Sequence, residues 1–131
     1  MARRRSRTLT EVELEFMRII WERGEVSTEE VLKALQEQGR LLSDGSVRKI
    51  LSILVAKGYA ARRPRGRAFL YRATAPEEQT KKGLLMDLVS RAFGGSSALM
   101  VAALLDTRAV RKGDIEAIKR LIAEREKEGI Q

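Results

Sequence analysis

Apolar residues recur at helical spacing over the first sixty positions and predict three helices there. Thr10 with Glu13, and Ser27 with Glu30, form capping boxes that begin the first two helices. The third helix covers residues 43–58. Because only a few residues join the second helix to the third, the pattern predicts a helix-turn-helix.

The third of these helices has an unusual outer face. Its apolar residues fall on one side: Val47, Ile50, Leu51, Leu54 and Val55. The opposite side carries small residues and a cation in place of alternating Glu and Lys: Gly45, Lys49, Ser52 and Ala56. Small residues let the backbone approach another molecule, and the major groove of DNA is wide enough to admit one helix. The alternative is an ordinary amphipathic helix of the protein core.

A β-hairpin is predicted directly after this helix. Residues 59–61 and 68–71 are strand-like, and Pro64 and Gly66 favour a tight turn between them. Val26 predicts a further brief strand. Four arginines are expected at the hairpin tip: Arg62, Arg63, Arg65 and Arg67. Because these cations repel one another unless a polyanion neutralises them, the hairpin is predicted to be a wing that rests on the DNA backbone.

Residues 76–131 return to a helical pattern, with apolar faces that are too large to stand exposed. These helices are too few to enclose a core of their own, so we expect them to pack against the same segment of a second chain. The alternative is packing on the winged helix of the same chain. The predicted dimerisation residues are all apolar: Leu84, Leu85, Leu88, Val89, Phe93, Leu99, Val101, Leu104, Leu105, Ile115, Ile118, Leu121 and Ile122.

The charge distribution separates the same two parts. The chain of 131 residues has a formal net charge of +8. Residues 1–75 hold 16 Lys and Arg against 9 Asp and Glu, whereas residues 76–131 hold 10 against 9. A basic surplus favours polyanionic partners such as nucleic acid. We predict a mainly α fold with a small β-hairpin, arranged as a disordered basic arm (1–8), a winged-helix DNA-binding domain (9–75) and a helical dimerisation domain (76–131).

The N-terminal arm is strongly basic. Its Arg3, Arg4 and Arg5 are predicted to follow phosphates or to enter a minor groove, the alternative being a solvated tail. Charged residues follow the arm, where a signal peptide would have an apolar core. No apolar run approaches the about 18 residues that span a bilayer. We therefore expect a cytoplasmic protein without a membrane partner.

Absent residue types exclude several kinds of site. The chain has no cysteine, which excludes disulfides, thiolate catalysis and cysteine-ligated zinc or copper. It has no histidine, which removes the commonest general base and nitrogen ligand. An enzyme acting through Glu13 and Glu15, or through Glu29 and Glu30, is disfavoured because these carboxylates lie on helix caps and solvated turns. We predict no catalytic site, no metal and no cofactor.

Four stretches, in this order and spacing, resemble the penicillinase and methicillin-resistance repressor family: LTEVELEFMRIIWERGEVSTEEVLKAL, SVRKILSILVAKGY, RAFLYRA and RAFGGS. The resemblance covers residues 8–126. It implies a bacterial dimeric repressor that reads a palindromic operator through a winged helix and dimerises through three C-terminal helices. In studied relatives a sensor-transducer membrane protease triggers cleavage in the short apolar helix. That implies a sensor protease as partner and a cleavage site at Ala103–Leu104, where those relatives have Asn-Phe.

The recognition helix matches the family only in part. Ser46 and Arg48 lie where the family commonly has Thr and Lys or Arg, so the resemblance implies DNA contacts for both. Gly45 and Lys49 replace residues that are often Thr, and Ile53 replaces a frequent Arg. We therefore expect this chain to read a different operator sequence. The cysteine-rich metal motif of a copper-responsive branch is absent.

The predicted mechanism is steric repression by a homodimer whose two recognition helices enter successive major grooves. Lys49 is expected to contact a base edge, because Lys or Arg to guanine is the commonest specific pairing. Phosphates are expected to meet the wing arginines and Ser43, Ser46 and Arg48, while Gly45 and Ser52 lie on the face that enters the groove. Two alternatives stay open: a small-molecule-responsive winged-helix regulator, and a winged-helix protein-interaction module that does not bind DNA.

Overall fold

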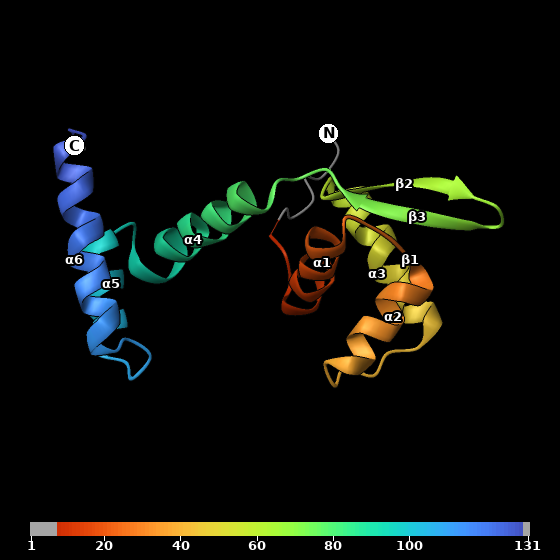
Figure 1. Cartoon of the computed structure of the whole chain (residues 1–131), viewed down its shortest axis with the longest axis horizontal. Coiled ribbons are helices and arrows are strands. Elements are labelled where there is room, and N and C mark those ends of the chain that lie inside the picture. Colours follow the sequence, from red (N-terminus) through yellow and green to blue (C-terminus); the bar gives the residue numbers. More distant parts are fainter. Residues whose placement is uncertain (1–7, 130–131) are drawn as a thin grey trace. The chain divides into compact units, whose positions relative to one another are not determined.

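The computed structural model describes residues 8–129, which form six helices and a three-stranded antiparallel sheet (Figure 1). The predicted mainly α fold with a winged helix-turn-helix is confirmed. Arg3, Arg4 and Arg5 of the predicted arm lie outside the described residues. The chain divides after Leu84 into two units, each compact in itself.

The first unit contains the winged helix. Its elements are, in order, α1 (Glu11–Arg23), β1 (Glu25–Ser27), α2 (Thr28–Glu37), α3 (Asp44–Lys57), β2 (Ala60–Arg65), β3 (Ala68–Ala73) and the start of α4 (Glu77–Phe93). Both predicted capping boxes are present, at Thr10 with Glu13 and at Ser27 with Glu30. Ser43 is the N-cap of α3, and its side chain accepts from Ser46 N. These caps fix the start of each of the three helices.

One apolar core joins α1, α2 and α3 to the sheet. Its fully buried members come from every one of these elements: Phe16, Met17, Ile20, Val26, Val31, Leu35, Val47, Leu51 and Leu54. Trp21 packs on the edge of this core, and its Nε1 donates to the carbonyl oxygen of Ala75 at 2.9 Å. The indole therefore anchors the segment that leaves β3, and it is not a platform for stacking bases.

The hairpin differs from the sequence prediction in where it turns. β2 runs through Arg65, and the two turn residues are Gly66 and Arg67, with Gly66 at a φ of 61°. A glycine with positive φ at the first turn position is typical of a tight two-residue hairpin. Arg62 and Arg63 therefore lie in a strand and not at the tip. Pro64 is tolerated within β2 because the strand order β1-β3-β2 leaves β2 at the sheet edge.

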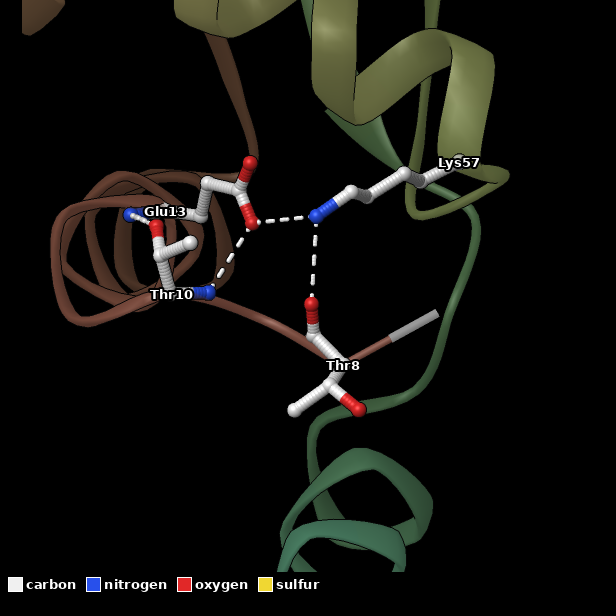
Figure 2. Close-up of polar contacts among 4 residues, drawn as sticks. All are labelled: Thr8, Thr10, Glu13 and Lys57. Carbon is white, nitrogen blue, oxygen red and sulfur yellow. Dashed lines mark hydrogen bonds and ion pairs between the residues drawn. The ribbon is translucent and has the colours of Figure 1, made fainter. Parts of the chain in front are cut away.

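A buried ion pair connects the start of α1 to the end of α3 (Figure 2). Lys57 Nζ, at the end of α3, lies 2.7 Å from Glu13 Oε1 at the start of α1. The side chains are only 14% and 8% exposed. Lys57 Nζ also donates to the carbonyl oxygen of Thr8 at 3.1 Å, and Glu13 Oε1 accepts from Thr10 N at 2.9 Å. The carboxylate thus caps α1 and fixes the last turn of α3 at once.

A second ion pair holds the turn before α3. The guanidinium of Arg40 donates through Nε and Nη2 to the two carboxylate oxygens of Glu15 on α1, at 2.7 and 2.6 Å. This hydrogen bonding is the main reason that the pKa of the Glu15 carboxyl lies below its usual value. Because Arg40 lies between α2 and α3, the pair fastens the connection that leads into α3 to the first helix.

The second unit contains the rest of α4, α5 (Ser97–Leu105) and α6 (Lys112–Lys127). α4 begins one residue later than predicted, since Pro76 precedes it and its carbonyl oxygen accepts from Thr80 N. Among residues 8–129, no single helix is long and apolar enough to cross a membrane, although α4 and α5 together reach that length and composition. In this unit many large apolar side chains are exposed.

Loss of the Lys57 ammonium is expected to destabilise the first unit. Lys57→Met should lower the free energy of unfolding by about 3 kcal/mol, because it leaves the buried Glu13 carboxylate without its cationic partner. Glu13→Gln combined with Lys57→Met should recover part of this loss, since no buried charge then remains. Urea unfolding followed through Trp21, the single tryptophan of the chain, reports on this unit.

Lys81→Met is the matched control, because it removes the same group from exposed pairs with Glu77 and Glu78. Its effect should stay below about 1 kcal/mol. Equal losses for Lys57→Met and Lys81→Met would contradict the structural role of the buried pair.

The Glu15–Arg40 pair should give stability a defined acid dependence. Because the pKa of Glu15 is lower in the folded protein than in the unfolded chain, its stabilisation is complete above the unfolded value, about 4.3, and is lost as pH falls through the folded value. The stability difference between wild type and Glu15→Gln should therefore be constant near neutral pH and shrink below about 4.3. Urea unfolding at several pH values measures it, with Glu22→Gln, an exposed position of α1, as control. A difference that grows in acid would contradict this.

Candidate nucleic-acid interface

The outer face of α3 is open to solvent as its sequence predicted. Gly45, Lys49 and Ser52 are exposed, and a Cβ added to Gly45 would meet nothing closer than Ser43 Oγ at 4.0 Å. Among the described residues, Lys49 forms no ion pair, so its ammonium is available to a ligand. The backbone of α3 can therefore approach another molecule closely at its first turn, with a cation one turn further on.

The first turn of α3 is internally braced. Ser43 Oγ accepts from Ser46 N at 3.1 Å and donates to Ser46 Oγ at 3.0 Å. Arg48 Nε lies 2.9 Å from Asp44 Oδ2, in a pair whose side chains are 70% and 52% exposed. An exposed pair of this kind is weakly held, so a phosphate can compete with Asp44 for the guanidinium.

The arginines of the wing, defined here as β2, β3 and the turn between them, point to two different faces. The register pairs Arg62 with Tyr71 and Arg63 with Leu70, so the first two arginines project to opposite sides of the sheet. On the side of Tyr71, Arg62 Cζ lies 4.4 Å from the centre of the Phe69 ring. This cation–π contact holds the guanidinium flat against the wing.

On the other side, Arg63 is paired with the first strand. Its Nε and Nη2 each donate to a carboxylate oxygen of Glu25 at 2.8 Å. This hydrogen bonding is the largest cause of both a lowered pKa for the Glu25 carboxyl and a raised pKa for the Arg63 guanidinium. Arg65 and Arg67, at the end of the wing, form no ion pair with any described residue.

A groove of about 660 Å³ lies between α3, the start of α2 and the wing. Its cations come from both sides, with Arg48 on α3 and Arg62 and Arg67 on the wing. Its full lining also contains hydroxyl, carboxylate and apolar groups: Ser27, Thr28, Glu29, Leu32, Asp44, Ser52, Ala68, Phe69 and Tyr71. The structure thus brings together cations that lie up to 19 residues apart in the sequence.

Several of these residues could not be found from the sequence pattern. Phe69 was visible only as one member of an alternating strand, and its contact with Arg62 depends on the register of the hairpin. Glu25 pairs with a residue 38 positions away, and no local signal predicts that. Glu29 and Asp44 were expected as solvated or capping residues, whereas both line the groove.

The chemistry of this surface suits a polyanion. Its cations are exposed, a helix with a bare outer face lies beside them, and small hydroxyl side chains flank them. Over residues 8–129 no group of three Asp or Glu side chains is arranged to hold a metal ion. The groove thus combines exposed cations with small hydroxyl groups.

Comparison with known proteins identifies relatives over most of the chain. A family model described as Penicillinase repressor matches residues 9–124. An uncharacterized 16.5 kDa protein of Latilactobacillus sakei is 30% identical over 114 residues, which cover 87% of this chain and 77% of that protein. The penicillinase repressor of Bacillus licheniformis is 25% identical over 116 residues, or 88% of this chain and 90% of that protein.

Two solved structures resemble this chain in fold. The solution structure of the DNA-binding domain of the repressor BlaI matches with a TM-score of 0.50 and 28% identity, over 57% of this chain and 90% of that domain. Wild-type MarR from E. coli, in its apo form, matches with a TM-score of 0.53 over 88% of this chain and 76% of that one. At 17% identity the second likeness concerns the fold alone.

Proposed function

This chain belongs to the penicillinase repressor family, and we propose that it represses transcription by binding a palindromic operator in double-stranded DNA as a homodimer. The family is one of repressors and not of enzymes, and the similar winged helix of BlaI is a DNA-binding domain. The observation that supports the proposal best is the groove in which cations of α3 and of the wing converge.

Within this proposal, α3 enters the major groove and the wing lies on the flanking backbone. Lys49 contacts a base edge, because it is the exposed, unpaired cation on the outer face of α3. Arg48, Arg62, Arg65 and Arg67 contact phosphates. A dimer that neutralises about eight phosphates should show a log–log salt slope near −7.

The exposed apolar side chains of the second unit support the proposal of a homodimer. The large apolar side chains that are exposed among the described residues lie almost all in this unit, the exceptions being Leu41 and Phe69. Leu99, Leu104 and Leu121 are 60%, 43% and 52% exposed. Of the other predicted dimerisation residues, Val89 is buried within the chain itself, at 3%, and Leu84 packs against the core of the first unit. Apolar exposure on this scale is typical of a face that another chain covers.

In this proposal, repression results from the dimer occupying the operator. A dimer that fills two successive major grooves excludes other proteins from that segment of DNA. Induction would then require the dimer to separate or to leave the operator. Ala103 and Leu104, the candidate cleavage site, lie exposed on α5. Cleavage there by a sensor protease would break one of the helices that we assign to the dimer interface.

Selection of bound sequences from random DNA by the purified full chain tests the proposal. Recovery of a two-fold symmetric site is expected. Absence of enrichment at low salt would overturn DNA binding and favour the protein-interaction module. A compound that stabilises the protein thermally and weakens binding to the recovered site would favour the small-molecule-responsive regulator.

Two substitutions should separate base reading from phosphate contact. Lys49→Ala is expected to cost about 1–3 kcal/mol and to relax sequence preference at one position in each half-site. Arg65→Ala should weaken binding to all sequences alike and reduce the magnitude of the salt slope by about one for each subunit. Fluorescence anisotropy with matched and mismatched sites measures both effects. A loss for Arg65→Ala that depends on sequence would contradict its assignment to phosphate.

If the exposed apolar residues of the second unit form the dimer interface, a charged residue introduced there should disrupt the dimer. Leu121→Glu should shift the protein from dimer to monomer in sedimentation equilibrium, because a carboxylate would be buried in an apolar interface. Leu41→Glu is the matched control, since Leu41 is 80% exposed but lies in the first unit. It should leave the oligomeric state unchanged. A monomeric wild type, or dimers with both variants, would contradict the proposed interface.

A further inference from the structure

The outer part of the wing, residues 64–69, is less supported than the part of the sheet next to β1. β1 pairs with β3 only over Glu25↔Arg72 to Ser27↔Leu70. Beyond that point Pro64, Arg65, Ala68 and Phe69 belong to a ribbon of two strands. An isolated two-stranded ribbon is marginally stable and twists readily. The direction in which the wing projects must therefore be fixed where the third strand ends.

Arg63 lies at that point. It is paired with Leu70, which in turn is paired with Ser27, the last residue of β1. From there its guanidinium crosses the central strand to Glu25, two residues back along β1, with both bonds at 2.8 Å. Leu70 projects to the same side between the two groups and is only 5% exposed. The pair thus spans all three strands at the base of the wing and covers the central one.

The geometry of the pair resists rotation as well as separation. A guanidinium that donates two parallel hydrogen bonds to one carboxylate fixes the angle between the groups, which a lysine ammonium cannot do. The lowered pKa of the Glu25 carboxyl is consistent with a pair that persists near neutral pH. Arg62 and Arg67 line the groove beside α3, whereas Arg63 does not.

We propose that Glu25 and Arg63 are positioning residues that set the angle of the wing, and that Arg63 does not contact phosphate. This inference rests on the proposed function, because it concerns the surface that meets DNA. It assigns different roles to arginines that the sequence placed together at the hairpin tip. Arg65 and Arg67 meet the backbone, and the Glu25–Arg63 pair holds them where they can do so.

The effect of Glu25→Gln on DNA affinity distinguishes a positioning role of the pair from a phosphate contact by Arg63, because the two predict changes in opposite directions. If the pair sets the wing angle, the variant should weaken binding to the selected operator about fivefold, with little change in salt slope. If Arg63 contacts phosphate and Glu25 only competes for it, the variant should bind more tightly with a salt slope steeper by about one for each subunit. Tighter binding would overturn the proposal.

Glu29→Gln is the matched control for charge. Glu29 is an exposed carboxylate on the groove lining and forms no ion pair with any described residue. Removal of the Glu29 carboxylate should tighten DNA binding, because it takes away a negative charge that repels the phosphates. Opposite signs for Glu25→Gln and Glu29→Gln are therefore expected, and equal signs would contradict a positioning role.

Two further variants test the geometry. Arg63→Lys keeps the charge but loses the paired hydrogen bonds, so it should weaken binding as Glu25→Gln does. Exchanging the two residues, Glu25→Arg with Arg63→Glu, keeps both the net charge and an acid–arginine pair, so it should bind about as wild type does. A phosphate contact by Arg63 predicts instead that Arg63→Lys binds nearly as wild type and that the exchange binds more weakly than wild type.

Hydrogen exchange in the free protein tests the pair independently of DNA. Amides of residues 65–69 should exchange faster in Glu25→Gln than in wild type, while those of α1 stay unchanged. Unchanged exchange in the wing would overturn the proposal. If wild type bound no DNA at all, the proposed function would fail, and the exchange experiment would still decide whether the pair holds the wing.

Discussion

The ion pair between Glu13 and Lys57 is the constraint on which the winged helix depends. One carboxylate caps the first helix through Thr10 N and accepts the ammonium that ends the recognition helix (Figure 2). Both side chains are buried, so separating the two groups would leave a buried charge without a partner, which costs stability. The axis of α3 is thereby tied to α1 at one end, while the first turn at its opposite end is exposed.

Two further acid–arginine pairs continue this arrangement towards the surface. Glu15 with Arg40 holds the turn before α3, and Glu25 with Arg63 lies at the base of the wing. In each, the acid belongs to an earlier element and the arginine to a later segment of the first unit. The cations of the chain therefore fall into two groups. Some are bound within the fold, and others, such as Lys49 and Arg65, have no partner among the described residues.

The sequence predicted what depends on local order. Capping boxes and the bare face of α3 result from neighbours within a few positions, and the structure confirms both of them. It did not predict pairings across the fold. Arg62 and Arg63 are adjacent and chemically alike, yet the strand directs one to Phe69 and the other to Glu25. Only the register between strands distinguishes them, and register depends on contacts between distant segments.

The position of Pro64 in β2 has a consequence for how the protein behaves at high concentration. An edge strand offers unpaired backbone groups to any other strand, and such edges are sites of aggregation. β2 lacks one amide hydrogen at Pro64 and is flanked there by Arg63 and Arg65. Two copies that met along this edge would bring like charges together at a strand that cannot complete its ladder. The residues that make the wing cationic thus also protect its open edge, and selection for solubility and selection for binding would act on the same positions.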